Sequence, residues 1–199
     1  MKHLSFTTLA LSCALPLLFA CAPLQAAEPE QPGVAWQPTL QAGAATLQLN
    51  GAGVRTQGVG GLYAAGLYLD QKLATPDAVW RNGAAKQLRV VMLRDAGAAE
   101  MGDLLARGMV ANASDEELSR LAPMLFRLGE ILGGQQRLAA GDSFQIDWQP
   151  GLGTAIRING QLQGEPFREP EAFGVMLRLW LGPQPADGVL KNALLGRAA

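Results

Sequence analysis

The segment between Gln31 and Leu69 carries a single charged residue, Arg55, within the run GAGVRTQGVGGLYAAGLYL. A charge kept in apolar surroundings must be compensated by a partner. The part of this run from Leu62 is apolar throughout and bounded by glycines, which is typical of a strand covered on both faces. The chain therefore has to fold around a buried strand that lies next to an arginine in need of a partner.

Length and composition indicate one domain. The chain has 199 residues, of which 49% are hydrophobic and 17% charged, enough for one core of ordinary size. We expect a leader at 28–44 and a single folded domain at 45–199. The formal net charge is −1 and no basic run occurs, which argues against nucleic-acid partners and against polybasic membrane binding.

The first 27 residues have the pattern of a secretory signal peptide. A positive start is followed by an apolar run and small residues, with cleavage expected after Ala26 or Ala27. An alternative is a lipoprotein cut before Cys21, which is disfavoured because Phe19 is bulky for that motif. We expect a periplasmic protein, with lipid anchoring through Cys21 as the alternative and no transmembrane span in the mature chain.

This processing restricts the chemistry. His3 is the only histidine, and Cys13 and Cys21 are the only cysteines. Cleavage after Ala26 leaves neither residue type, which excludes histidine-dependent nucleophilic catalysis and metal sites built from His or Cys. We expect no cofactor and no metal. Any function must then depend on arginine, tyrosine and other polar side chains, and on the shape of the binding site.

The hydrophobic pattern predicts an α+β domain, an antiparallel sheet with helices layered on one side. Strands are predicted at 46–51, 62–69, 87–94, 143–149 and 154–158, and helices at 100–112, 114–132, 170–181 and 187–195. Asn50-Gly51 and Asn159-Gly160 are predicted to form tight turns. Ser114 and Glu117 form a capping box, and Pro123 should kink or delay the helix that follows. Strand 143–149 alternates so that Asp147 should face water.

The glycines near Arg55 do not form a nucleotide-binding motif, because Thr56 breaks the G-x-G-x-x-G spacing. They are better explained by turns and by close backbone approach within a sheet.

Arg55 has two interpretations. It can offer a planar fork of donors to a ligand carboxylate, phenolate or enolate, or it can be a structural arginine tied to backbone carbonyls or to an acid such as Asp95. Tyr63 and Tyr68 are the only tyrosines and, being five residues apart on one strand, they face opposite sides. At most one of them can join Arg55 in a common pocket.

Several ordered motifs resemble the bacterial chalcone isomerase-like family. They are NGAGVR (50–55), LYAAGLYL (62–69), PGLGTAIRING (150–160) and WLGPQPADGVLKNALLG (180–196). The resemblance implies an open-faced β-sandwich in which helices cover an antiparallel sheet and a ligand cleft lies between them. In the enzymes of this fold the matching arginine holds a substrate phenolate during an intramolecular addition, and in the fatty-acid-binding relatives an arginine and a tyrosine hold a carboxylate.

The resemblance carries these roles to particular residues. Arg55 matches the arginine found in both the enzymes and the fatty-acid-binding relatives. Tyr63 stands where the enzymes have a threonine, and it looks more like the tyrosine that binds the carboxylate in the fatty-acid-binding relatives. Phe173 stands where the enzymes have a hydroxyl-bearing residue near the C-terminus. Asn112 is the nearest candidate for the helical asparagine. Arg55 and Tyr63 are thus the candidate catalytic pair, and Tyr68, Asn112 and Phe173 complete the candidate ligand-binding set.

Three functions follow, in order of preference. The first is an exported, non-catalytic binder of a small amphipathic anion such as a fatty acid, anchored by Arg55. The second is an intramolecular lyase or isomerase that stabilises an oxyanion without histidine. The third is a structural or partner-binding envelope protein.

Overall fold

The computed structural model describes residues 34–197, so the predicted signal peptide lies outside the described residues. The strands are β1 (Thr39–Ala42), β2 (Ala45–Thr56), β3 (Gly61–Leu69), β4 (Lys86–Met92), β5 (Ala96–Gly97), β6 (Arg137–Leu138), β7 (Ser143–Gln149), β8 (Gly153–Ile158) and β9 (Gln161–Leu162). The helices are α1 (Pro76–Arg81), α2 (Ala98–Asn112), α3 (Asp115–Arg120), α4 (Ala122–Gly133), α5 (Ala172–Leu181) and α6 (Gly188–Leu194).

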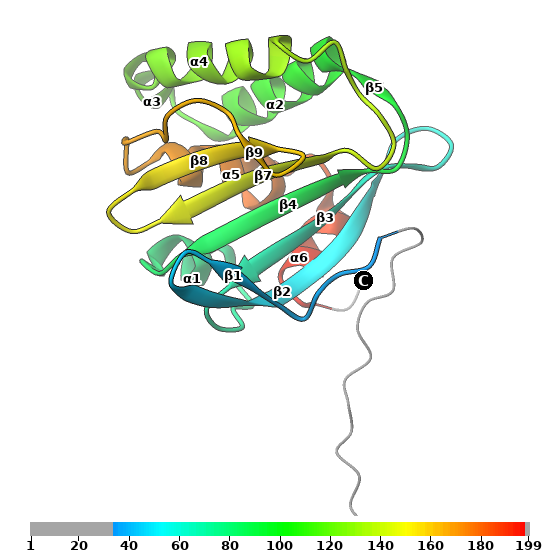
Figure 1. Cartoon of the computed structure of the whole chain (residues 1–199). Helices are drawn as coiled ribbons and strands as arrows, with labels where there is room; N and C mark the ends of the chain where they lie inside the picture. The colour runs from blue at the N-terminus through cyan, green and yellow to red at the C-terminus, as the bar shows by residue number, and fades with distance from the viewer. Residues whose placement is uncertain (1–33, 198–199) are drawn as a thin grey trace, which may run out of the picture.

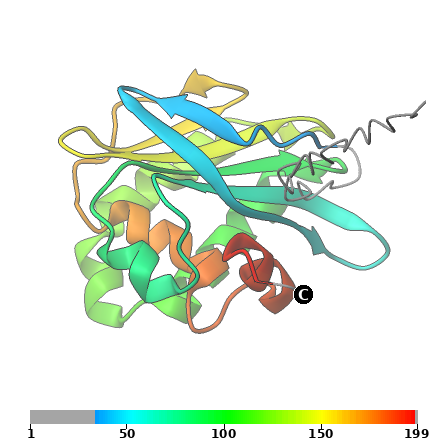
Figure 2. The ribbon, with the colours of Figure 1, turned by 90° about the horizontal axis from the view of Figure 1, so that it is seen from below.

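Seven strands form one antiparallel sheet in the order β1-β2-β3-β4-β7-β8-β9 (Figure 1). The sheet curls, and the helices cover one of its sides (Figure 2). The predicted α+β class, an antiparallel sheet with a helical layer, is confirmed. Within residues 34–197, no helix is both long enough and apolar enough to cross a membrane.

Strand β3 is buried on both faces, as its apolar run predicts. On the helix side Tyr63, Ala65 and Leu67 belong to the main core. On the opposite side Tyr68 belongs to a smaller core with Trp36, whose indole lies over Gly66. The helices cover one face of β3, and the segment before β1 covers the other.

The expected turn at Asn50-Gly51 is wrong. Strand β2 runs straight through these residues, and its pairing with β3 instead shifts between Leu49 and Gly51, so that Asn50 is the extra residue of a β-bulge. The Asn50 amide group is buried and donates to the carbonyls of Leu73 at 3.0 Å and Leu194 at 2.7 Å. Backbone groups from distant segments satisfy the hydrogen-bonding groups of this side chain. This explains why Asn50 does not form the turn of a hairpin.

The sheet begins earlier than residue 45. Residues 39–42, assigned above to the leader, form the edge strand β1 and pair with β2 across a turn at Gly43, where φ is +63°. Extended backbone beside an open sheet edge gains ladder hydrogen bonds whatever its side chains are, so a weak sequence pattern was enough for pairing.

Pro123 divides the predicted helix at 114–132 into α3 and α4, with the proline in the first turn of α4. The capping box is present: Glu117 N donates to Ser114 Oγ at 3.2 Å, and Ser114 N donates to Glu117 Oε2 at 3.1 Å. Both features therefore act as the sequence predicted.

Asp147 does not face open water, contrary to the alternation of β7. Its side chain is buried, where it accepts a hydrogen bond from Gln87 Nε2 at 2.7 Å and pairs with Arg157 Nε at 3.1 Å. Burial raises the pKa of this carboxyl, and the two partners oppose that effect. The face of the sheet away from the helices is thus polar but partly covered.

Glycines in β2 allow α6 to pack directly on the sheet. A Cβ at Gly51 would overlap the carbonyl oxygen of Ala193, and one at Gly53 would lie 2.8 Å from the Ala193 Cβ. These two glycines permit close backbone approach, as the sequence indicated. The contact places α6 beside the bulge and fixes the strand that carries Arg55.

We expect Gly51→Ala to lower the free energy of unfolding by roughly 1–3 kcal/mol, because the added methyl group must push α6 away from β2. Urea denaturation measures this loss. Gly102→Ala is the matched control: it adds a methyl group where nothing lies within 4 Å, inside a helix, and should be neutral or stabilising. Equal stability of Gly51→Ala and the wild type would show that α6 does not pin this strand.

Candidate functional site

The bulge at Asn50 determines which face Arg55 occupies. Before it, Leu49 pairs with Tyr68 and faces the smaller core. After it, the register places Gly51, Gly53 and Arg55 on the helix side. Arg55 then lies opposite Tyr63, and its guanidinium carbon is 5.9 Å from the centre of the Tyr63 ring.

Tyr63 is held from the helical layer. It is almost fully buried, and its hydroxyl oxygen accepts a hydrogen bond from Trp180 Nε1 of α5 at 3.0 Å. Burial raises the pKa of this phenol, while hydrogen bonding to Arg55, the positive charge of Arg55 and the bond from Trp180 act against the increase. The group keeps its proton at neutral pH, and that proton has no acceptor within residues 34–197.

The Arg55 guanidinium interacts with the Tyr63 hydroxyl but has no acidic partner in an ion pair among residues 34–197. Its Nη1 is buried and has no hydrogen-bond partner in the described part of the chain, where no carboxylate oxygen lies within 4 Å of the guanidinium either. Asp95, the acid considered above, instead pairs with Arg137 at 3.0 Å and accepts from the backbone of Ala140 at 2.9 Å. Arg55 therefore does not form the ion pair with Asp95 that the sequence allowed.

Within residues 34–197, two neighbouring groups thus have a hydrogen-bond donor with no protein acceptor. One is Nη1 of Arg55 and the other is the hydroxyl proton of Tyr63. A buried donor without an acceptor costs free energy, and a charged one costs more. A pair of such donors beside one positive charge is suited to a carboxylate or another oxyanion.

The other three predicted residues lie apart from this pair. Tyr68 faces the opposite side of the sheet and donates to the carbonyl of Gln37 at 3.0 Å. Asn112 ends α2, and its amide group exchanges hydrogen bonds of 2.7 and 2.8 Å with the backbone of Gln184. Phe173 lines a separate cavity near the start of α5. The structure brings together Arg55 and Tyr63 only.

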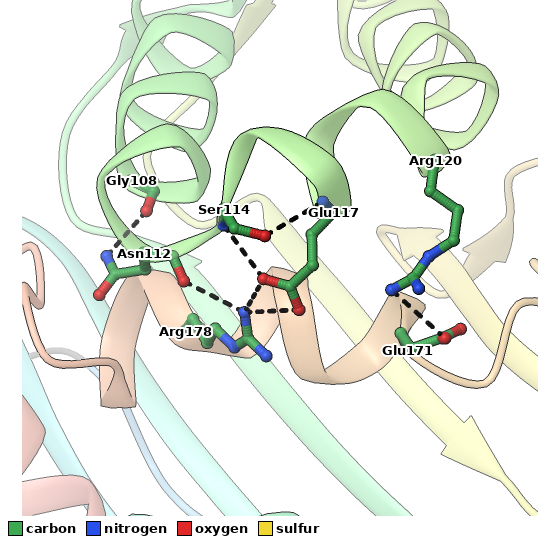
Figure 3. A network of polar contacts seen from close by, with 7 residues as sticks. All are labelled: Gly108, Asn112, Ser114, Glu117, Arg120, Glu171 and Arg178. Carbon is green, nitrogen blue, oxygen red and sulfur yellow. Dashed lines mark hydrogen bonds and ion pairs between the residues drawn. The ribbon is translucent and has the colours of Figure 1, made fainter.

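Asn112 has a clear structural task, which Figure 3 shows in part. Its side chain also donates to the Gly108 carbonyl at 2.8 Å, and its own carbonyl accepts from Arg178 of α5 at 3.1 Å. These bonds join the end of α2 to α5 and to the loop after it.

Trp180 was missed as a member of the site. The sequence places it on the apolar stripe of the helix at 170–181, where a tryptophan reads as core. Asp187, the N-cap of α6, was likewise read as a helix-end charge, yet it is close enough to act on the Tyr63 phenol. No local sequence pattern identifies either residue as part of the site, because both come close to Tyr63 only in the folded chain.

Comparison with known proteins agrees with this architecture. The model of the chalcone isomerase-like family matches residues 28–196, so the chain belongs to that family. A search of curated proteins gives no significant match. Among solved structures, the chain is similar to the fatty-acid binding protein AtFAP1 of Arabidopsis thaliana, with a TM-score of 0.58 and 15% identity over 82% of this chain and 92% of that one. At this identity the likeness shows the shared fold.

The buried Tyr63 phenol gives stability a pH dependence. Folding raises its pKa above 10.0, so its contribution is complete below that value and is lost as the pH rises further, when the unfolded chain ionises this tyrosine first. We expect the free energy of unfolding to fall as the pH rises above about 10, and to fall less steeply in Tyr63→Phe. Urea denaturation across this range measures both slopes, and identical slopes would contradict the assignment.

Proposed function

We propose that this protein is a non-catalytic binder of a small amphipathic anion such as a fatty acid, whose carboxylate pairs with Arg55 and accepts the hydroxyl proton of Tyr63. The observation that carries the proposal is the buried Nη1 of Arg55, which has no acceptor in the described residues, where no carboxylate oxygen lies within 4 Å of the guanidinium either. A ligand carboxylate would supply both the missing acceptor and the counter-charge.

The surroundings of the pair suit an amphipathic ligand. Tyr63 and Trp180 are core residues, so the head group would lie among apolar side chains of the sheet and of α5. Arg55 as a whole is only partly buried, which leaves the guanidinium a route to solvent. The carboxylate of an incoming ligand meets the charge first, and its apolar tail gains by burial against the helical layer.

The comparisons support the same class of ligand. The family includes members of the chalcone isomerase fold, and AtFAP1 is described as a fatty-acid binding protein. A shared fold leaves the ligand open, so the proposal depends on the two free donors and not on the likeness alone.

Arg55→Met should weaken binding of dodecanoate at least about tenfold, because a charge-assisted hydrogen bond to a buried head group is lost. Isothermal titration calorimetry measures the affinity, and dodecanol serves as the neutral ligand that should be affected far less. Arg89→Met is the matched variant: Arg89 also lies on a strand of this sheet, but it lines a groove on the face away from the helices. Unchanged dodecanoate affinity in Arg55→Met would refute the anchor.

The two tyrosines provide a second comparison. Tyr63→Phe removes the proposed donor and should weaken dodecanoate binding about threefold to tenfold. Tyr68→Phe removes a hydroxyl on the other face and should bind as the wild type does. Equal losses in both variants would point to a general loss of stability, which a thermal unfolding scan of each variant detects.

The lyase alternative predicts a different result. Steady conversion of a hydroxychalcone by the wild type, abolished in Arg55→Met, would establish catalysis in place of simple binding. In that mechanism Arg55 would supply charge stabilisation, with the Tyr63 ring 5.9 Å from its guanidinium carbon.

Export to the periplasm is part of the proposal and rests on the pattern of residues 1–27. The intact mass of the mature protein separates cleavage after Ala26 or Ala27 from a lipid-modified N-terminus at Cys21.

A further inference from the structure

A cavity of about 400 Å³ lies between α1, the start of α5 and the adjoining ends of β4 and β7. Its walls carry three aromatic rings, from Trp80, Trp148 and Phe173, together with the side chain of Lys86. This volume is in the range of small-molecule sites, which are typically apolar with a few polar groups. The cavity does not include Arg55 or Tyr63 among its lining residues.

Lys86 is a buried cation without a counter-ion. Its residue is 5% exposed, it donates to the carbonyl of Asn82, and its ammonium lies 5.7 Å from the centre of the Phe173 ring. Within residues 34–197, no carboxylate oxygen lies within 4 Å of this ammonium. Burial lowers the pKa of Lys86, and Asp70, whose carboxylate accepts from Asn82 Nδ2, opposes the decrease from a greater distance.

The other charges at this cavity already have partners. Arg178 pairs with Glu117 at 2.9 Å, and Glu171 pairs with Arg120 at 3.5 Å (Figure 3). Both partners come from α3, which thereby holds α5 in place along one wall of the cavity. The positive charge of Lys86 is the one that this arrangement leaves uncompensated, and a bound anion would remove part of its desolvation cost.

The aromatic walls restrict the kind of anion. Rings of Trp80, Trp148 and Phe173 offer flat apolar surfaces on which another ring gains by offset or edge-to-face packing. A small inorganic anion would meet Lys86 and leave these surfaces unused. A planar ring that carries one carboxylate uses both features.

We propose that this cavity is a second binding site, for a small aromatic carboxylate, in which Lys86 pairs with the carboxylate and the ligand ring lies among the three aromatic side chains. The site is separate from Arg55: Phe173 and Trp180 lie about 10 Å apart along α5. Lys86 lies about 20 Å along β4 from Met92, which pairs with Tyr63. The proposal is independent of the function proposed for Arg55.

The test is calorimetric titration of the full chain with phenylacetate and with its neutral analogue phenylacetamide. The wild type should bind phenylacetate at least about tenfold more tightly than phenylacetamide. Lys86→Met should abolish that preference. Because this substitution removes a buried unpaired charge, its melting temperature should equal or exceed that of the wild type, which separates lost binding from lost folding.

Two control variants complete the design. Lys191→Met removes a lysine that donates to the Gly182 carbonyl at 2.8 Å, away from this cavity, and should keep the preference for phenylacetate. Arg89→Met, on the face of the sheet away from the helices, should also keep it. The Arg55 proposal is tested with dodecanoate, so failure here and failure of that proposal are distinguishable. The inference is overturned if the wild type binds neither compound, binds both equally, or shows the same preference when Lys86 is replaced.

Discussion

One extra residue in β2 determines which face of the sheet carries Arg55. Side chains alternate along a strand, so the bulge at Asn50 moves every later position of β2 to the other face. Without it, Arg55 would lie on the polar side of the sheet, away from Tyr63 and from the helices. The bulge is itself held by tertiary contacts, since the Asn50 amide bonds the carbonyl that ends α6, and Gly51 lets that helix approach.

Some charged side chains of the molecule have a partner of opposite charge, and others do not. Asp147, Glu117 and Asp95 all have cationic partners. The guanidinium of Arg55 and the ammonium of Lys86 do not, although both lie beside aromatic rings on the helix side of the sheet. An unpaired buried cation lowers stability, and its retention is reasonable where a ligand supplies the anion.

Much of the fold could be predicted because its signals are local. The continuous apolar run of β3, the alternation of β7, the capping box at Ser114 and the break at Pro123 each occupy a few consecutive residues. Two of the errors fell where a distant partner overrode a local pattern. Asn50-Gly51 became a bulge because α6 and the segment at Leu73 satisfy the asparagine, and residues 39–42 became a strand because a sheet edge was available.

The sequence by itself determined most of the long strands and helices, the family, the isolation of Arg55 from other charges along the chain and the opposite facing of the two tyrosines. Only the tertiary structure decided that Trp180 donates to the Tyr63 hydroxyl, that Asp95 pairs with Arg137 and not with Arg55, and that Phe173 lies with Lys86 in a cavity apart from Arg55. The reason is physical: periodicity and capping are set by neighbours along the chain. Whether a charge meets an acceptor depends on side chains that folding brings from distant strands and helices.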